Sequence, residues 1–148
     1  MGSVKRVVIE SPFSSGTTPR IVAVEERNLR YLRACMRDCF ERGEFPYASH
    51  GLYTQPGVLD DHDPAERALG MQAGFAWGEL GDLVAVYLDL GLSRGMEAGI
   101  ARAAMRGTPL EERRLGGRWA ECSERGALLP MCGEDGHAYG CPLWRAPA

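Results

Sequence analysis

The sequence predicts an α/β fold in which a parallel sheet of four or five strands is covered by helices. Short apolar runs typical of buried strands alternate with longer segments that have helical periodicity. Strands that alternate with helices usually pair in parallel through right-handed crossovers. The chain has 148 residues, of which 45% are hydrophobic, and this length suits a single core.

The first half of the chain predicts two strands around one helix. A strand is expected at residues 4–11, followed by a loop rich in turn-forming residues that ends at Pro19. A helix is expected at 21–42 and a second strand at 44–49. Apolar residues at helical spacing predict the inner face of this helix: Leu29, Leu32, Cys35, Met36, Cys39 and Phe40.

The second half predicts two further strand–helix pairings and an irregular end. A polar loop at 50–63 precedes a helix that Pro64 opens, at a position where proline is tolerated. Its inner face is expected at Leu69, Ala73, Ala76 and Trp77. The remaining elements are a strand at 82–88, a helix at 96–105, a strand at 109–115 and an irregular tail at 117–148.

Composition excludes several classes of function. The net charge of −3 argues against a nucleic-acid binder, which usually presents a basic face. No apolar run approaches the roughly 18 residues of a membrane span, and no signal peptide is evident, so we expect a cytoplasmic protein without membrane partners. The five cysteines are an odd number, and a cytosolic setting disfavours disulfides.

The segment 89–101, Asp-Leu-Gly-Leu-Ser-Arg-Gly-Met-Glu-Ala-Gly-Ile-Ala, is the most informative motif. Asp89 follows a predicted strand, and Glu97 lies in the first turns of the next helix. Ligands of open α/β sheets bind at the carboxyl ends of the strands, so the two carboxylates form a candidate catalytic pair. The alternative is structural, with Asp89 capping the loop and Glu97 favouring the helix dipole.

This motif resembles the signature of the nucleoside 2-deoxyribosyltransferases, whose superfamily includes nucleoside 5'-monophosphate N-glycosidases. Glu97 matches the family's nucleophile and Asp89 matches the Asp that opens the motif, with about one extra residue between them. Segment 7–16 resembles the family's first strand and substrate loop. The resemblance covers roughly residues 4–115 and implies a flavodoxin-like three-layer sandwich at 1–116, with 117–148 as the tail.

The resemblance implies cleavage of the N-glycosidic bond of a nucleoside 5'-monophosphate, without a cofactor. Transfer of deoxyribose between bases is the alternative enzymatic function, and a non-catalytic nucleotide-binding module is the third. The family usually has another Asp in the helix before the third strand, whereas residues 70–77 contain no acid. Its absence disfavours base exchange, because Gln72 offers hydrogen bonds but no acid.

Two loops are candidate substrate contacts. Hydroxyl groups and backbone N–H groups of the loop 14–18, together with Ser93 and Arg94, suit a 5'-phosphate, although a plain polar turn is the alternative. The resemblance implies that the loop after the second strand helps to recognise the base. His50 in this loop is a possible proton donor or a merely solvated side chain. The predicted substrate-binding residues are Ser11, Phe13, Ser14, Ser15, Gly16, His50, Tyr53, Gln55, Gly91, Ser93, Arg94 and Gly95.

Two further expectations concern the tail and assembly. No metal site is expected, and ordinary thiols are favoured over structural zinc at Cys122, Cys132, His137 and Cys141, which lack a tight Cys-x2-Cys pair. Members of the resembled family pair subunits to close each active site. We therefore expect a homodimer or a higher even oligomer.

Overall fold

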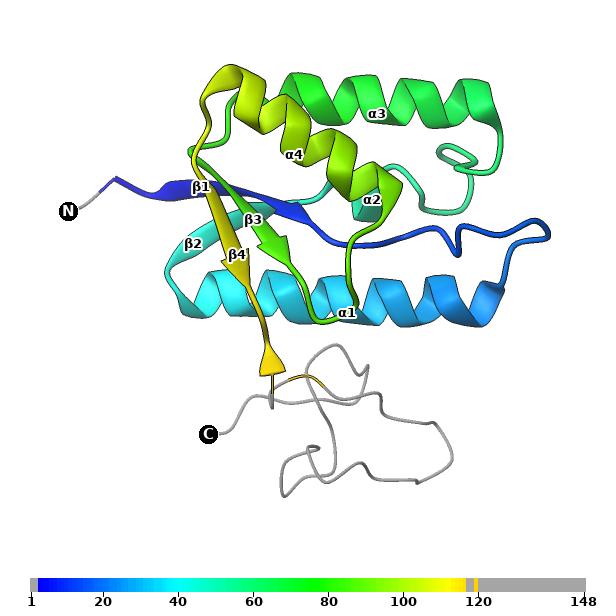
Figure 1. The fold of residues 1–148 in the computed structure, drawn as a ribbon, viewed down its shortest axis with the longest axis horizontal. Coiled ribbons are helices and arrows are strands. Elements are labelled where there is room, and N and C mark those ends of the chain that lie inside the picture. Colours follow the sequence, from blue (N-terminus) through cyan, green and yellow to red (C-terminus); the bar gives the residue numbers. More distant parts are fainter. Residues whose placement is uncertain (1–2, 117–118, 120–148) are drawn as a thin grey trace.

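A parallel sheet forms the centre of the molecule in the computed structural model, which describes residues 3–116 and Trp119. Within these residues the sheet has four strands in the order β2-β1-β3-β4, and all neighbours pair in parallel (Figure 1). The strands are β1 (Lys5–Glu10), β2 (Glu44–Tyr47), β3 (Leu83–Tyr87) and β4 (Leu110–Arg113). The predicted α/β fold with a four- or five-stranded parallel sheet is confirmed.

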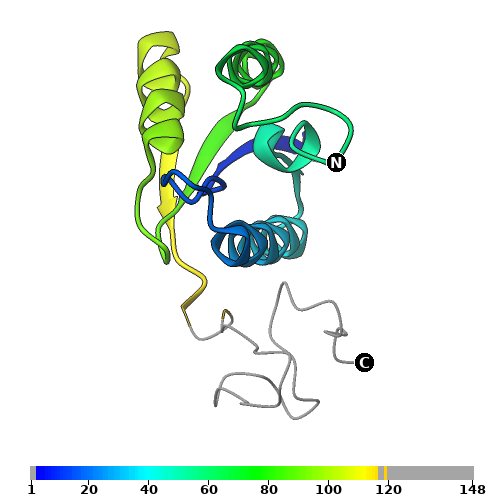
Figure 2. The same cartoon turned by 90° about the vertical axis from the view of Figure 1, so that its right-hand side faces the viewer.

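Helices cover both faces of the sheet, which gives the predicted flavodoxin-like three layers (Figure 2). The helix α1 (Val22–Glu41) lies on one face, whereas α3 (Pro64–Gly78) and α4 (Arg94–Arg106) lie on the other. Right-handed crossovers impose this division, because the chain moves in one direction along the sheet from β1 to β2 and in the opposite direction afterwards. No helix among the described residues is long and apolar enough to cross a membrane.

Side chains of the central strands alternate between the two faces, as the two-residue period of a strand requires. Val7 and Ile9 of β1 belong to the core beneath α1, which also contains Tyr31 and Cys35. Val8 instead packs against the smaller core beneath α4. Glu10 has the same parity as Val8 and therefore points to the side of α3 and α4.

Three local predictions were wrong. Phe40, expected on the inner face of α1, is 55% exposed. On α3, Leu69 and Trp77 are 56% and 59% exposed, and Ala76 is exposed as well. The opposite face of α3, with Gly70, Gly74 and Gly78, lies toward the interior and lines a cleft. The predicted loop at 50–63 also contains part of a short helix, α2 (Ser49–Leu52).

A buried ion pair joins the two edge strands through the α1 side of the sheet. Arg113 of β4 donates from Nη1 and Nη2 to the Glu44 carboxylate of β2, at 2.7 and 2.8 Å. The Arg113 side chain is 2% exposed. Its Nε also donates to Glu111 at 2.8 Å, but Glu111 is 45% exposed. Glu44 and Glu111 therefore bind the same guanidinium, but the Glu44 carboxylate is largely buried and the Glu111 carboxylate is exposed to solvent.

We expect Glu44→Gln to lower the free energy of unfolding by about 3–5 kcal/mol, because it leaves a buried guanidinium without its main counter-charge. Glu111→Gln is the matched control and is expected to cost at most about 1 kcal/mol, since that pair is exposed to solvent. Urea unfolding followed by circular dichroism measures both. Equal losses would contradict a dominant role for the buried pair.

Candidate active site

A cleft of about 560 Å³ lies on the α3/α4 face of the sheet and is lined by residues from both helices and from β1. The loops that follow β1 and β3 form its rim. The chain reverses its direction along the sheet between these two neighbouring strands, so the cleft occupies the position where open α/β folds bind ligands. Its volume falls within the range of roughly 300–1,000 Å³ that is usual for small-molecule sites.

Glycines on α3 keep the cleft open on one side. Gly70, Gly74 and Gly78 recur every fourth residue and therefore share one helix face, which lines the cleft. At Gly74 the backbone lies so close to α2 that a Cβ atom would come within 2.7 Å of Ser49 Oγ. Larger side chains on this face would fill the space between the helix and the sheet.

The loop after β3 brings the N-terminus of α4 to the rim of the cleft. Gly91 has a φ of 80°, a left-handed conformation that glycine adopts without strain and that turns the chain after the strand. Ser93 then caps the helix by accepting a hydrogen bond at Oγ from Met96 N–H at 3.3 Å. Ser93, Arg94 and Gly95 all line the cleft.

Most of the predicted substrate-binding residues meet in this cleft. Those that line it are Ser11, Phe13, Ser14, Ser15, Gly16, His50, Ser93, Arg94 and Gly95. Tyr53, Gln55 and Gly91 do not line it. Gln55 is exposed and donates a hydrogen bond to the Leu52 carbonyl at 2.9 Å. Cys122, Cys132, His137 and Cys141, for which ordinary thiols are favoured over structural zinc, lie outside the described residues.

Glu97, the nucleophile that the resemblance implies, does not line the cleft. Its side chain is exposed, whereas Met96 and Gly99 are buried and line the cleft wall. Successive residues of an α-helix are rotated by about 100°, so a helix that directs positions 96 and 99 to the cleft directs position 97 away from it. The nucleophilic role of Glu97 therefore remains a prediction from the resemblance alone.

Asp89 also lies outside the cleft, and its carboxylate is fully engaged in hydrogen bonds. It accepts from the Tyr31 hydroxyl at 2.5 Å and from the backbone N–H groups of Leu115 and Gly116 at 2.9 Å. Burial alone would raise the pKa of Asp89, but these hydrogen bonds outweigh it and lower the pKa. In this arrangement Asp89 fastens the chain after β4 to β3 and α1, which supports the structural alternative.

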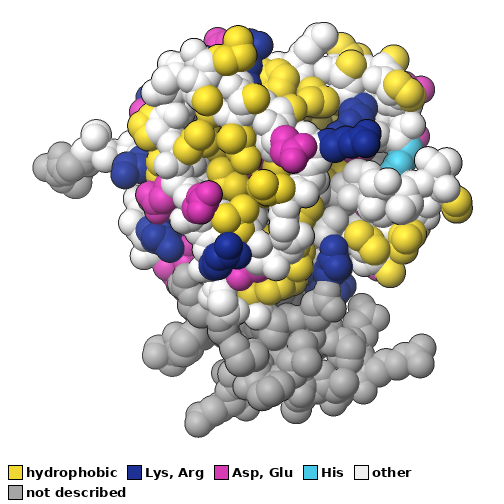
Figure 3. Space-filling model, viewed as in Figure 1, with side chains coloured by type: hydrophobic (Ala, Val, Ile, Leu, Met, Phe, Trp, Pro, Cys, Tyr) yellow, Lys and Arg dark blue, Asp and Glu magenta, His cyan; other side chains and the backbone are white. Residues whose placement is uncertain are grey.

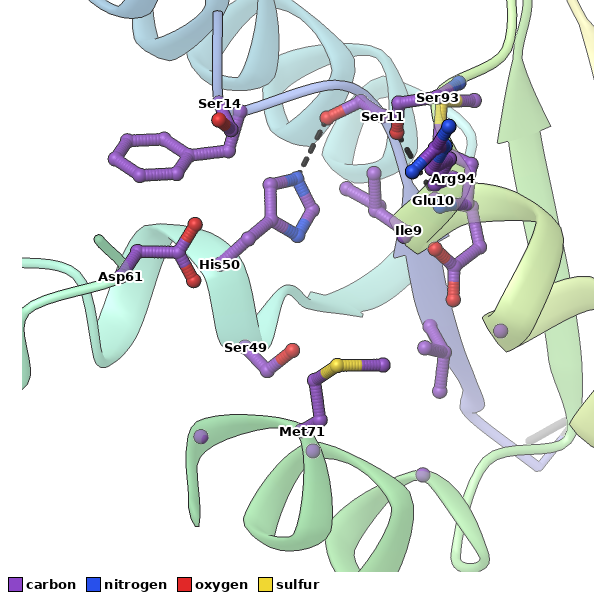
Figure 4. A pocket seen from close by; sticks show the side chains of 18 of the residues that line it. Ile9, Glu10, Ser11, Ser14, Ser49, His50, Asp61, Met71, Ser93 and Arg94 are labelled. Atoms are coloured by element: carbon purple, nitrogen blue, oxygen red, sulfur yellow. Dashed lines mark hydrogen bonds between the residues drawn. The ribbon is translucent and has the colours of Figure 1, made fainter. Parts of the chain in front are cut away.

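Glu10, the last residue of β1, places its carboxyl group in the cleft (Figure 4). It packs against Gly99 of α4, where a Cβ atom would overlap the carboxyl group. The side chain is half-buried, and burial raises its pKa to about 8. Glu10 is therefore largely protonated at neutral pH, in contrast to an exposed glutamate.

His50 faces the same space from α2 and contacts the residue after Glu10. Its Nε2 lies 2.7 Å from Ser11 Oγ, and Ser11 is 4% exposed (Figure 4). Burial lowers the pKa of His50 to about 4, so the imidazole is neutral at pH 7. A neutral imidazole that carries its proton on Nδ1 accepts the Ser11 hydroxyl proton at Nε2. His50 therefore fits a proton acceptor better than the proton donor that the sequence indicated.

Arginines supply the positive charge of the cleft. Arg94 and Arg106 of α4 and Arg67 of α3 line it. Arg67 pairs with Asp61 at 2.5 Å, and Arg106 donates to the Phe75 carbonyl at 3.3 Å. Arg94 is exposed at the rim beside the helix N-terminus. The arrangement suits an anionic group at the rim, because a guanidinium and a helix dipole both favour negative charge there.

Sequence reasoning did not select Glu10, Ser49, Arg67 or Arg106. Glu10 could have been recognised as a charged residue at the end of an otherwise apolar strand, with its side chain on the same face as that of Val8. The arginines carry no such signal, because a helical Arg is usually a solvated residue.

The fold and the cleft together define a flavodoxin-like α/β domain with a cleft that reaches the carboxyl ends of its central strands. Residues 5–113 match the family model described as "Domain of unknown function (DUF7768)", so the chain belongs to that family. A comparison with curated proteins gives no match.

We expect Glu97→Gln to change the turnover of a nucleotide substrate by less than about threefold, because the exposed side chain does not reach the cleft. The measurement is steady-state release of free base under saturating substrate. A loss of about 100-fold or more, the usual effect of removing a catalytic acid–base group, would restore Glu97 to the reaction.

Proposed function

We propose that this protein hydrolyses the N-glycosidic bond of a nucleoside 5'-monophosphate in the cleft between α3 and α4. The proposal rests on one observation: the same cleft contains a carboxyl group and, at its rim, groups that can bind an anion. Glu10 lies inside, and Ser93, Arg94 and the loop 14–16 lie at the rim. The resemblance of segments 7–16 and 89–101 to the nucleoside 2-deoxyribosyltransferase superfamily supports the same chemistry.

The rim suits a phosphate better than an uncharged sugar. Ser93 places its backbone and hydroxyl at the N-terminus of α4, a 13-residue helix whose dipole favours an anion. Arg94 adds a charged donor from the same turn. Hydroxyl groups of Ser14 and Ser15 line the cleft from the loop after β1. A 5'-phosphate at the rim leaves the sugar and base for the interior.

Hydrolysis is favoured over base exchange because the cleft face of α3 lacks an acid. Positions 70, 71, 74, 75 and 78 of α3 line the cleft as Gly, Met, Gly, Phe and Gly. The carboxyl groups that line it within the described residues are those of Glu10 and Asp61, and Asp61 pairs with Arg67. One observation favours a non-catalytic module that binds nucleotide without turnover: Glu97, the nucleophile that the resemblance implies, lies outside the cleft.

Incubation with a panel of ribo- and deoxyribonucleosides and their 5'-monophosphates, with and without a second base, tests these functions. Free base from a monophosphate supports the proposed hydrolase. A new nucleoside or nucleotide carrying the second base would indicate a transferase instead. Binding by equilibrium dialysis without either product would indicate the non-catalytic module, and neither binding nor product would refute a nucleotide site.

We expect Arg94→Ala to raise KM for the monophosphate about 10- to 100-fold, because a charge-assisted hydrogen bond contributes roughly 1.5–3 kcal/mol. The KM for the matching nucleoside should change little, since it lacks the phosphate. Arg33→Ala, an exposed arginine of α1 on the opposite face of the sheet, is the control. If Arg94→Ala raised KM equally for both substrates, Arg94 would not bind the phosphate.

We also propose that the protein forms a homodimer or a higher even oligomer through the outer face of α3. Leu69 and Trp77 of α3 are 56% and 59% exposed, and Leu80, in the turn after the helix, is 54% exposed. Hydrophobic side chains reach the surface over α3 and α4 in Figure 3. An exposed apolar stripe of this kind usually marks an interface. A partner on this face would also hold the helix whose other side lines the cleft.

Light scattering at micromolar concentration measures this assembly. We expect twice the chain mass of 16.2 kDa, or an even multiple of it. Trp77→Glu should shift the population to monomer because it places a charge in the apolar contact. A wild-type mass near 16.2 kDa in a preparation that binds nucleotide would contradict the interface.

The protein is proposed to act in the cytoplasm. Cys35 and Cys39 are both free thiols although they lie one helical turn apart in the core. Unpaired cysteines are typical of proteins in a reducing compartment.

A further inference from the structure

We propose that Glu10 is the general acid that protonates the leaving base, and that Ser11 and His50 relay the proton of the attacking water. This assignment rests on the proposed N-glycosidase function and names the groups that would perform it. In this assignment the nucleophilic carboxylate of Glu97 on α4 is replaced by a general acid, Glu10 on β1, and a base, His50 on α2.

The position of Glu10 comes from the pleat of β1 and from a glycine on α4. Val8 and Glu10 share one face of the strand, and Gly99 leaves the room that the Glu10 carboxyl group occupies. Neither a hydrogen bond nor an ion pair to this carboxyl group is found within the part of the chain that the structure describes. The group therefore lies in the cleft without a partner that would fix it as a carboxylate.

The protonation state of Glu10 follows from this position. Burial without a counter-charge disfavours the carboxylate and raises the pKa to about 8. A neutral carboxyl group is a proton donor at pH 7, whereas an ordinary glutamate is not. The charged side chains that line the cleft around Glu10 and His50 are Asp61 and Arg67, which pair with each other, and Arg94 and Arg106 of α4.

His50 has the complementary state in the same cleft. Its lowered pKa of about 4 keeps the imidazole neutral at pH 7. In the tautomer that carries its proton on Nδ1, Nε2 can accept a proton, and Ser11 Oγ lies 2.7 Å from that atom. When the Ser11 hydroxyl donates to Nε2, the lone pairs of its oxygen remain to accept a proton from water. Environments that separate the pKa values of two neighbouring groups in this way are typical of an acid–base pair.

The reaction balances with water as the second substrate. The bond between C1' and the base nitrogen breaks, and its electron pair stays on that nitrogen, which takes the proton of Glu10. The water oxygen bonds to C1', and the water proton passes to Ser11 as the Ser11 proton moves to His50 Nε2. The products are the free base and the sugar phosphate, and solvent then reprotonates Glu10 and deprotonates His50.

The test follows kcat for base release against pH with the most rapidly cleaved nucleoside 5'-monophosphate of the panel. Because Glu10 must be protonated, kcat should fall as the pH rises through about 8, where its carboxyl group ionises. Glu10→Gln should lower kcat about 100-fold or more and remove this alkaline limb. Its binding of the monophosphate in equilibrium dialysis should stay within about threefold, since the amide keeps the shape of the acid.

Matched variants complete the test. Glu26→Gln, an exposed glutamate on α1, is the control and should keep both rate and pH profile. His50→Gln should lower kcat while the alkaline limb remains, because that limb belongs to Glu10. The wild-type pH profile needs no variant, so the proposal stays testable if a substitution prevents folding.

The two levels of the proposal fail differently. If the wild type releases base but Glu10→Gln keeps its rate, or the wild-type rate does not fall above pH 8, Glu10 is not the acid and the N-glycosidase function stands. If the wild type binds the monophosphates but releases no base, both the function and the acid–base assignment are overturned.

Discussion

The pairing of β1 with β3 is the constraint on which the rest of the structure depends. These strands are neighbours in the sheet but are separated along the chain by α1, β2, α2 and α3. The chain must therefore pass outward to β2 and return across β1, and right-handed crossovers then place α1 on one face and α3 and α4 on the other. The cleft exists because these two helices share the face above the carboxyl ends of the central pair.

The two faces of the sheet serve different purposes. Beneath α1 the packing is dense, and the Tyr87 hydroxyl donates to Asp38 at 2.8 Å while Arg113 joins the edge strands. Beneath α3 and α4 the packed core is small, and the cleft occupies the remaining space. The larger buried core lies on one face, whereas the other face keeps polar groups such as Glu10 and His50 in a partly desolvated cleft.

The order of strands and helices could be predicted from the sequence because it depends on local periodicity. Strand β3, with its run of apolar residues, and helix α3, opened by Pro64, were both predicted within a few residues. The face that α3 turns inward could not be predicted, because an apolar stripe such as Leu69 and Trp77 shows which residues share a face and not what covers it. Here the glycine face lies toward the sheet.

The candidate site was predicted in part for the same reason. The segments after β1, β2 and β3 converge at the edge where these parallel strands end, so Ser14, His50 and Arg94 could be expected near one another. The sequence could not show which carboxyl group enters the cleft. Whether Glu97 or Gly99 of α4 faces the cleft depends on how the helix is rotated about its axis. A choice between Glu97 and Glu10 needs the packing of that helix against β1, which no local pattern of the sequence encodes.

The glycine face of α3 has a consequence for how a ligand enters. Each glycine inside a helix weakens it by roughly 1 kcal/mol relative to alanine, and α3 carries Gly70 and Gly74 within its span. The helix that walls the cleft is therefore intrinsically easier to unwind than a helix built without them. The feature that makes room for a ligand therefore also lowers the free-energy cost of unwinding this wall of the cleft locally.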